Sequence, residues 1–489
     1  MGDKTQTIFG NTMKDSVVRK AEKTKKAFLA EFGDDSTKHF ILTDRAIPEL
    51  DEMGVRNLMV SETVETDTKP IDLSKDTEAL VVGNIRMGFG HYRISIAIAS
   101  AARSMGLKPY LFDLHSFKET TGGKIIAKQN GLYSLGSRLS QKYTLFNKLY
   151  WEPLNSEGFR KISYNAVDQK TAELMATPCR LLPKNIPYVA THVWPSQAAV
   201  HAGMTHVVNA IPDNWPMALH LSEGATHCVQ TPSSWFGYKT LNGMDGENIL
   251  NGMDDGSLVN TGHYIDHELV SNLEADTALR LSRIENGKAL RVLLTVGGAG
   301  AQRELFASIL RKLLPMADAG KVVLFINVGD HKGVLEGLRA DIPALSAATF
   351  HSDNWAETRS FAEKALKKEV TGVHLFYNTD IFSAVYATNI LMRASDLLVT
   401  KPSELAFYPV PKLHIKRIGG HEAWGAIRSA EVGDGTIECP TIAKTLQMLD
   451  LLLNKKEALT IMNQAILSAN KIGTYSGAYR AVELALANK

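Results

Sequence analysis

The sequence is poor in cysteine, and its cysteines are far apart. Cys179, Cys228 and Cys439 form no C-x-x-C pair. This spacing excludes a structural zinc site built on such pairs and is typical of a reducing compartment. No apolar run reaches the length of a transmembrane helix, and residues 1–26 contain no apolar stretch of signal-peptide length. The sequence therefore predicts a cytoplasmic protein.

An excess of charge of either sign is also missing. The chain has 54 Lys and Arg residues against 52 Asp and Glu, a formal net charge of +2. This balance excludes a nucleic-acid coat and an acidic tail. At 489 residues, with 44% apolar and 22% charged residues, the chain is long enough for two or three well-packed domains. The sequence predicts a multidomain protein without a nucleic-acid partner, and it does not predict an oligomeric state.

Three familiar ligand motifs are absent. No glycine-rich loop ends in GK[ST], which excludes a Walker site, and no small residue follows Gly88-Phe89-Gly90 at the position where GxGxxG requires one. A dinucleotide cofactor is therefore not expected. The chain also lacks a DxD pair, so the sequence predicts neither a bound metal nor any other cofactor.

Two glycine-marked loops, about two hundred residues apart, are the strongest positive signals. The first follows the apolar run 80–82 and contains Gly88, Gly90 and His91; the second follows 292–296 and contains Gly297, Gly298 and Gly300. Each apolar run is typical of a buried parallel strand, and each loop precedes a segment with helical periodicity. Glycine after such a strand lets the backbone approach a ligand, and the N–H groups at a helix start can bind an anion. Tight packing alone would also explain both loops.

Alternating strand and helix patterns predict an α/β protein with two doubly wound, Rossmann-like domains facing a cleft. We expect an N-terminal, largely helical extension at 1–78, a first Rossmann-like domain at 79–270 and a second at 285–465. Residues 466–489 form a C-terminal helix that we expect to pack on the N-terminal domain. The segment 266–289 is the predicted linker.

Polar residues follow two further predicted strands of the second domain. Lys401, Ser403 and Glu404 come after the run 397–400, and Glu404 could accept hydrogen bonds from a ribose diol. Gly420, His421 and Glu422 come soon after the run 412–418. Glu404 could equally be a glutamate that stabilises a helix start. His421 and Glu422 are more typical of a site than of packing.

The order of these motifs resembles the UDP-sugar glycosyltransferases of the GT-B fold. The most similar group contains monogalactosyldiacylglycerol synthase, processive diacylglycerol glucosyltransferase and the peptidoglycan N-acetylglucosaminyltransferase. The resemblance covers about 79–465 and is strongest over 390–436. Within it, the runs 394–401, 410–415 and 420–426 stand for three of the family's motifs.

This resemblance implies that 79–270 is the acceptor-side domain and that 285–465 is the nucleotide-sugar-binding domain. It also implies a role for each matched residue. His91 would lie beside the donor phosphates or act as the base on the acceptor hydroxyl, with Gly88 and Gly90 allowing close approach. Asp213 is the second candidate base. The pyrophosphate would be held by Gly297, Gly298 and Gly300, the ribose by Glu404, and the sugar by Gly420, His421 and Glu422. A transfer without a metal would also need backbone amides, helix dipoles and Lys401 or Arg303 to stabilise the leaving diphosphate, and Ser403 is a further expected donor-binding residue.

The family has a glycine-rich run between its lysine and its ribose glutamate, where this chain has only Pro402 and Ser403. Three functions remain open. The first is an inverting, metal-independent transfer of a hexose from a nucleotide diphosphate sugar to an acceptor hydroxyl. The second is epimerisation of a UDP-sugar with the help of His421. The third is nucleotide-sugar binding without catalysis.

The segment 118–165 mixes cations with leucines and aromatic residues, among them Lys142, Lys148 and Trp151. Such a face can lie among lipid headgroups, and related lipid transferases use this part of the chain for acceptor and membrane contact. A lipid acceptor with peripheral contact at the inner face of a membrane is one reading. An ordinary amphipathic helix pair covering the sheet, with a soluble glycan as acceptor, is the other.

Overall fold

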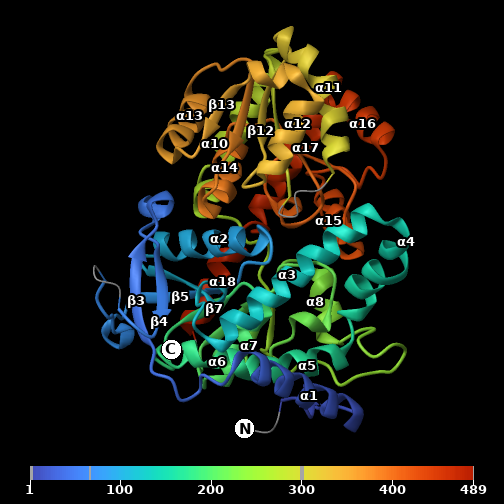
Figure 1. Ribbon diagram of the computed structural model, residues 1–489. Helices are drawn as coiled ribbons and strands as arrows, with labels where there is room; N and C mark the ends of the chain where they lie inside the picture. The colour runs from blue at the N-terminus through green and yellow to red at the C-terminus, as the bar shows by residue number, and fades with distance from the viewer. Residues whose placement is uncertain (1–3, 65–67, 298–301, 488–489) are drawn as a thin grey trace. The chain divides into compact units, whose positions relative to one another are not determined.

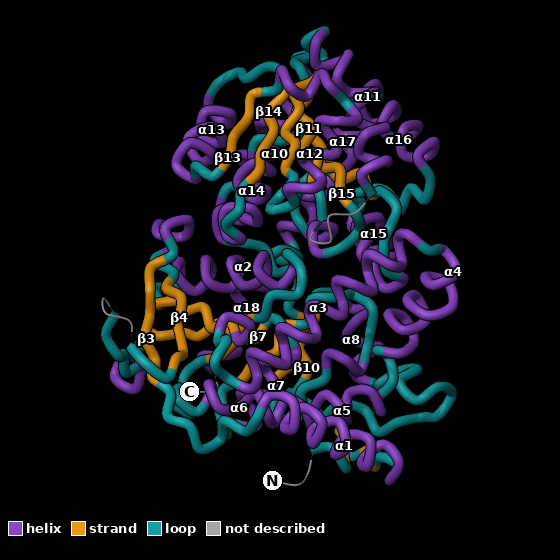
Figure 2. The backbone as a smooth tube through the Cα atoms, viewed as in Figure 1, coloured by secondary structure: helices purple, strands orange, loops and turns teal. Residues whose placement is uncertain are grey.

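The computed structural model describes residues 4–64, 68–297 and 302–487. The chain divides into two compact units (Figure 1). The first unit comprises Met1–Met87, Ile94–Asp266 and Ser476–Lys489, and the second comprises Gly88–Arg93 and His267–Tyr475. Each unit is built around a parallel sheet between helices, which confirms the predicted fold class of two Rossmann-like α/β domains (Figure 2).

The first unit contains an eight-stranded sheet in the order β10-β9-β8-β7-β5-β6-β4-β3. All neighbouring strands are parallel except β3 and β4. The sheet strands are β3 (Ile41–Ala46), β4 (Arg56–Ser61), β5 (Ala79–Asn84), β6 (Lys108–Asp113), β7 (Tyr188–Ala190), β8 (Val207–Ala210), β9 (Thr226–Val229) and β10 (Leu258–Asn260). The separate pair β1 (Thr7–Ile8) and β2 (Asn11–Thr12) is antiparallel.

Most helices of the first unit lie between residues 90 and 239, and the first and the last of them come from the two ends of the chain. They are α1 (Asp15–Phe32), α2 (Gly90–Ser104), α3 (Thr121–Lys142), α4 (Thr144–Phe146), α5 (Ile162–Ala172), α6 (Ala176–Cys179), α7 (Val193–His201), α8 (Pro232–Lys239) and α18 (Gly477–Ala487), with the first turn of α2 in the second unit. The segment 1–78 supplies two strands of the large sheet besides α1, and α18 packs on β7 and β8.

The second unit has a six-stranded, wholly parallel sheet in the order β13-β14-β12-β11-β15-β16. Its strands are β11 (Leu290–Thr295), β12 (Val322–Asn327), β13 (Thr349–Ser352), β14 (Val373–Tyr377), β15 (Leu397–Thr400) and β16 (Lys412–His414). Its helices are α9 (His267–Ser271), α10 (Leu273–Glu285), α11 (Arg303–Asp318), α12 (Lys332–Asp341), α13 (Trp355–Lys367), α14 (Ile381–Arg393), α15 (Ala423–Val432), α16 (Ile442–Asn454) and α17 (Lys456–Lys471).

Strands of this sheet are buried on both faces. Leu294 and Leu324 belong to a core cluster together with side chains of α11 and α12. Leu293 and Phe325 alternate with them and are also fully buried, and the ring of Phe325 lies 5.6 Å from that of Phe361 on α13. Burial on both faces requires continuous apolar runs, which is why the sequence pattern locates β11, β12 and β15. The half-exposed β13 carries no such pattern and is missed.

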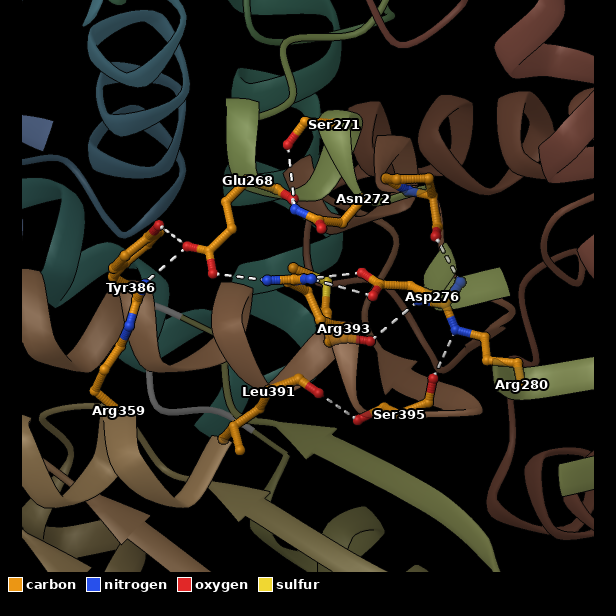
Figure 3. A network of polar contacts seen from close by, with 12 residues as sticks. Glu268, Ser271, Asn272, Asp276, Arg280, Arg359, Tyr386, Leu391, Arg393 and Ser395 are labelled. Atoms are coloured by element: carbon orange, nitrogen blue, oxygen red, sulfur yellow. Dashed lines mark hydrogen bonds and ion pairs between the residues drawn. The ribbon is translucent and has the colours of Figure 1, made fainter. Parts of the chain in front are cut away.

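The sequence predicts a linker at 266–289, whereas the structure folds this segment into α9 and α10 and anchors it by charge (Figure 3). Glu268 accepts hydrogen bonds from Arg393, Arg359 and Tyr386 at 2.7–3.2 Å. Arg393 also pairs with Asp276 at 2.9 Å. The segment is therefore an integral part of the second unit.

Arg280 lies at the centre of this anchor and is almost wholly buried. Its guanidinium donates to the carbonyl oxygens of Ser395 at 2.8 Å, Met392 at 3.2 Å and Pro409 at 3.3 Å. Burial lowers the pKa of Arg280 to about 10, with the charge of Asp276 opposing the shift, so the group is still charged at neutral pH.

Replacing Arg280 by Ala leaves these carbonyl groups without their donor. A buried unsatisfied group costs about 1–3 kcal/mol, so we expect the free energy of unfolding to fall by about 3 kcal/mol or more. Urea denaturation followed by circular dichroism measures the change. Arg311→Ala, at an exposed position of α11, is the matched control and should change stability by less than about 0.5 kcal/mol. Equal effects of the two substitutions would contradict the anchoring role.

Candidate functional site

The strand order places a topological switch point between β11 and β15. Strand β11 pairs with β12 on one side and with β15 on the other. The chain leaves β11 toward β12 and only later returns to form β15. Loops at the carboxyl ends of such strands diverge, and this is where open α/β sheets bind ligands. The loops that begin at Val296 and Lys401 occupy this place.

These two loops contact each other closely. A Cβ atom on Gly297 would come within 2.6 Å of Cε of Lys401, so the lysine side chain lies directly against this part of the backbone. Gly298 and Gly300, predicted from the same loop, lie outside the described residues. Arg303 begins α11 and pairs with Asp341 at 3.1 Å.

Lys401 is held by Glu422. The two side chains form an ion pair, and both are largely buried. The other carboxylate oxygen of Glu422 accepts hydrogen bonds from the backbone N–H of Ile418 at 2.8 Å and of Gly419 at 3.4 Å. Burial by itself would raise the pKa of Glu422, but the charges of Lys401 and His421 and these hydrogen bonds hold it below the usual range. Glu422 is therefore an ionised anchor for Lys401.

The glycine loop of β5 contributes its last residues to the second unit. Gly88 has a φ of +82°, a left-handed conformation that favours glycine. His91 lies in the first turn of α2, as predicted. Two residues later, Arg93 is buried and donates to the carbonyl oxygen of Val385 at 3.2 Å and to the side chain of Asn389.

Glu404 lies beside this segment. Its carboxylate is 3.8 Å from Nε of Arg93, and a Cβ on Gly90 would lie 3.3 Å from Oε2 of Glu404. The preceding Ser403 turns the chain, because its N–H donates to the carbonyl oxygen of Lys401 at 2.9 Å. The side chain of Glu404 is 17% exposed. The structure thus brings together Gly90, Arg93 and Glu404, which are far apart in the sequence.

The short turn before α15 begins at Gly420 and has His421 as its second residue. Within the described part of the chain, its buried Nδ1 reaches no hydrogen-bond partner. The ring lies against Gly419, where a Cβ would come within 2.6 Å of Cε1. The turn therefore places an imidazole next in sequence to the ionised Glu422.

Besides Arg93, two residues of the second unit were missed by the sequence argument. His331 hydrogen-bonds the carbonyl oxygen of Gly297 at 3.0 Å through Nε2, and its ring lies 5.3 Å from that of Phe89. Asn389 accepts from Arg93. His331 follows the buried strand β12 within four residues of its end, so polar residues after that strand were the signal that could have found it. Asn389 lies inside α14 and carries no comparable signal.

Asp213 belongs to the first unit and not to the cluster described above. It follows β8, and its Oδ2 lies 3.0 Å from Nε2 of His220. This pair is a second acid–base candidate, positioned by the hydrogen bond from Asn209 to the carbonyl oxygen of His220 at 2.7 Å.

Metal-binding and membrane-spanning features were sought in the described ranges. No group of three or more His, Cys, Asp and Glu side chains there is arranged to hold a metal ion. Among the same residues, none of the helices has the length and apolar character needed to cross a bilayer. The three cysteines are buried and free.

Comparison with known proteins gives two family matches and several similar structures. Residues 7–240 match the family described as "Domain of unknown function (DUF6937)", and residues 253–486 match "Domain of unknown function (DUF6938)". No curated protein matches the chain.

Three of the similar solved structures are enzymes. UDP-GlcNAc 2-epimerase from Neisseria meningitidis, bound to UDP-GlcNAc, is 12% identical with a TM-score of 0.43, covering 84% of this chain and 100% of that one. α,α-Trehalose 6-phosphate synthase from Burkholderia multivorans is 11% identical with a TM-score of 0.44, covering 84% and 98%. A glycosyltransferase from Rickettsia africae is 11% identical with a TM-score of 0.37, again covering 84% and 98%.

The Lys401–Glu422 pair predicts a pH-dependent effect on stability. Because the pKa of Glu422 is lowered in the folded protein, its ionisation stabilises the fold above the unfolded pKa, and this contribution is lost as pH falls through the folded pKa. Lys401→Met leaves a buried carboxylate without its cation and raises that pKa. We expect a loss of about 3 kcal/mol at neutral pH, decreasing as the carboxyl becomes protonated.

Urea titrations between about pH 4 and pH 8 measure this dependence. The matched control is the double variant Lys401→Met, Glu422→Gln, which removes both charges. At neutral pH, the free energy of unfolding that the double variant loses should be smaller than the sum of the losses in the two single variants. Strict additivity at neutral pH would show that the two side chains do not stabilise each other.

Proposed function

We propose that the protein is an inverting, metal-independent glycosyltransferase. It moves a hexose from a nucleotide diphosphate sugar of the UDP type to an acceptor hydroxyl. One observation carries the proposal: at the β11/β15 switch point, Lys401 lies against Gly297, and Glu404 lies beside Gly90 and Arg93. A backbone approach, a cation and a carboxylate are the groups that a pyrophosphate and a ribose diol require.

In this proposal Glu404 binds the ribose hydroxyls, and Lys401 stabilises the charge that develops on the leaving diphosphate. Gly88, Gly297, Gly298 and Gly300 allow the phosphates to approach the backbone. Glu422 holds Lys401 in place, and His421 with Gly420 contacts the sugar. His91 removes the proton of the acceptor hydroxyl, with Asp213 as the other candidate base. The hydroxyl oxygen then attacks the anomeric carbon opposite the departing diphosphate.

Epimerisation of the UDP-sugar is the second candidate. It is favoured by the buried Nδ1 of His421, which has no hydrogen-bond partner among the described residues and belongs to the residue next to the ionised Glu422. Such an arrangement is suited to moving a proton on a sugar carbon. Incubation of the protein with UDP-sugars alone, followed by NMR, separates the candidates. An epimer formed without acceptor supports the second. Release of UDP that depends on an added acceptor supports transfer, and donor binding with neither outcome supports a binding protein.

Replacing Glu404 by Ala removes the proposed ribose contact. Losing a hydrogen bond to a charged group costs about 1.5–3 kcal/mol, so donor affinity should fall by one to two orders of magnitude. Isothermal titration with UDP and UDP-sugars measures this loss. Glu363→Gln, at an exposed carboxylate of the same unit, is the control and should leave the affinity unchanged. An unchanged affinity of the Glu404 variant would remove this residue from the site.

Replacing His91 by Ala tests the base. Turnover should fall while donor affinity stays within about tenfold, because a base acts in the transition state and not in donor binding. Parallel measurements of kcat and donor Kd decide the matter. Equal losses in both would make His91 a phosphate contact, and full activity would leave Asp213 as the base.

We further propose that the acceptor is a lipid reached at an anionic membrane surface. Within residues 144–151, the exposed fractions of Leu145, Leu149 and Tyr150 are 70%, 68% and 58%. Lys148, beside them, is also exposed. Trp151, expected at the surface, is instead buried beneath Gly136, so it does not belong to this face. The side chain of Lys142 lies outside the described residues.

Vesicle binding tests this face. The protein should sediment with vesicles of anionic lipid, less so as salt rises. Replacing Leu145, Leu149 and Tyr150 together by Ser should abolish sedimentation without lowering the Tm. Ile249→Ser, at another fully exposed apolar side chain of the same unit, is the control. No sedimentation of the parent protein at low salt would favour a soluble glycan acceptor.

A further inference from the structure

A cavity of about 320 Å³ lies inside the first unit, among α1, α3, α5 and α7. It is lined by parts of the chain other than the site residues discussed above. Its walls are mainly apolar, with Phe28 from α1, Ile125 from α3 and Val167 from α5. A cavity of this size and lining is typical of sites for small molecules, which combine apolar walls with a few placed polar groups.

Asp168 is the deep polar group of this cavity. The residue is 7% exposed, and among the described residues no hydrogen-bond partner reaches its buried Oδ2. The indole N–H of Trp194, which lines the same cavity, lies close enough to this carboxyl to lower its pKa as a hydrogen-bond donor, but among the described residues it makes no hydrogen bond of full geometry. An unsatisfied buried carboxyl costs free energy, because it loses its water without gaining a partner. Such a cost is expected where a ligand supplies the missing donor.

Burial raises the pKa of Asp168 to about 7, with the nearby Trp194 opposing the shift. The carboxyl is thus close to the point of accepting or releasing a proton at neutral pH. A cationic donor would favour its ionised form, because an opposite charge in a buried site stabilises the carboxylate.

Cations stand at the outer edge of the cavity. Lys20 of α1 and Lys161, just before α5, line it and are both exposed. Phe28 and Asp168 are buried, so the lysines mark the end that faces water. The cavity therefore combines a deep carboxyl, an apolar body and a basic outer edge.

We propose that this cavity binds a small amphiphile with an ammonium group at its inner end and an anionic group at its outer end, joined by an apolar chain. The ammonium donates to Asp168, the chain contacts Phe28, Ile125 and Val167, and the anion pairs with Lys20 and Lys161. The site is independent of the proposed transferase activity.

Calorimetric titration of the full chain with three probes tests the proposal. The probe 8-aminooctanoate carries both end groups, octanoate lacks the ammonium and octylamine lacks the anion. We expect 8-aminooctanoate to bind at least tenfold more tightly than either of the others, which corresponds to about 1.4 kcal/mol per end group. Equal binding of all three probes, or no binding of any, would overturn the proposal.

Substitutions then separate the two ends. Asp168→Leu should reduce the affinity for 8-aminooctanoate to that for octanoate, while its Tm stays the same or rises because an unpartnered carboxyl is removed. If this variant does not fold, Asp168→Asn gives the same comparison with the original shape. Lys161→Gln should weaken 8-aminooctanoate binding and leave octylamine binding unchanged.

Lys23→Gln is the matched control, since Lys23 is exposed on α1 and does not line the cavity. It should change none of the three affinities. UDP binding by Asp168→Leu should equal that of the parent protein. A variant that loses probe binding but still binds UDP therefore tests the cavity and leaves the proposed function untouched. If UDP does not bind even the parent protein, the proposed function is contradicted and the cavity proposal is unaffected. Unaltered 8-aminooctanoate binding by both Asp168 variants would contradict the assignment.

Discussion

Burial of β11 and β15 on both faces is the constraint on which the candidate site depends. A strand with helices on each side consists mostly of apolar residues, and the polar residues of the candidate site follow the strand ends. The two strands are neighbours and parallel, so their carboxyl ends lie at the same edge of the sheet. The polar residues after them are consequently brought together, although about a hundred positions separate Gly297 from Lys401 in the sequence.

The ion pair between Lys401 and Glu422 depends on this arrangement. Two charges leave water with little net gain unless the remaining lone pairs are satisfied. Here the backbone N–H groups of Ile418 and Gly419 satisfy the second oxygen of Glu422. The pair thus joins the end of β15 to the turn before α15. An anionic ligand at Lys401 would meet a cation already held in position, which lowers the entropic cost of binding.

A second set of charges holds the start of the second unit. Glu268 and Arg280 tie α9 and α10 to α13, α14 and the carbonyl groups that follow α14 (Figure 3). Alternation of polar and apolar residues in 266–289 is compatible with a solvated linker. Only the hydrogen bonds of this segment to residues between 359 and 409 show that it is folded into the second unit. The same limit applies to Trp151. Its neighbours suggest a surface aromatic residue, and only the close approach of Gly136 buries it.

The sequence by itself determined the fold class, the strands β11, β12, β14 and β15, and the position of His91 at a helix start. These features follow from local apolar runs and from glycine, whose effects act over a few residues. The tertiary structure alone decided that Arg93 lies beside Glu404, that Glu422 holds Lys401, and that His331 contacts Gly297. It also decided that Asp213 pairs with His220, and that Asp168 is buried at a cavity between helices. Each of these depends on contacts between distant segments, and local periodicity contains no information about which segments meet.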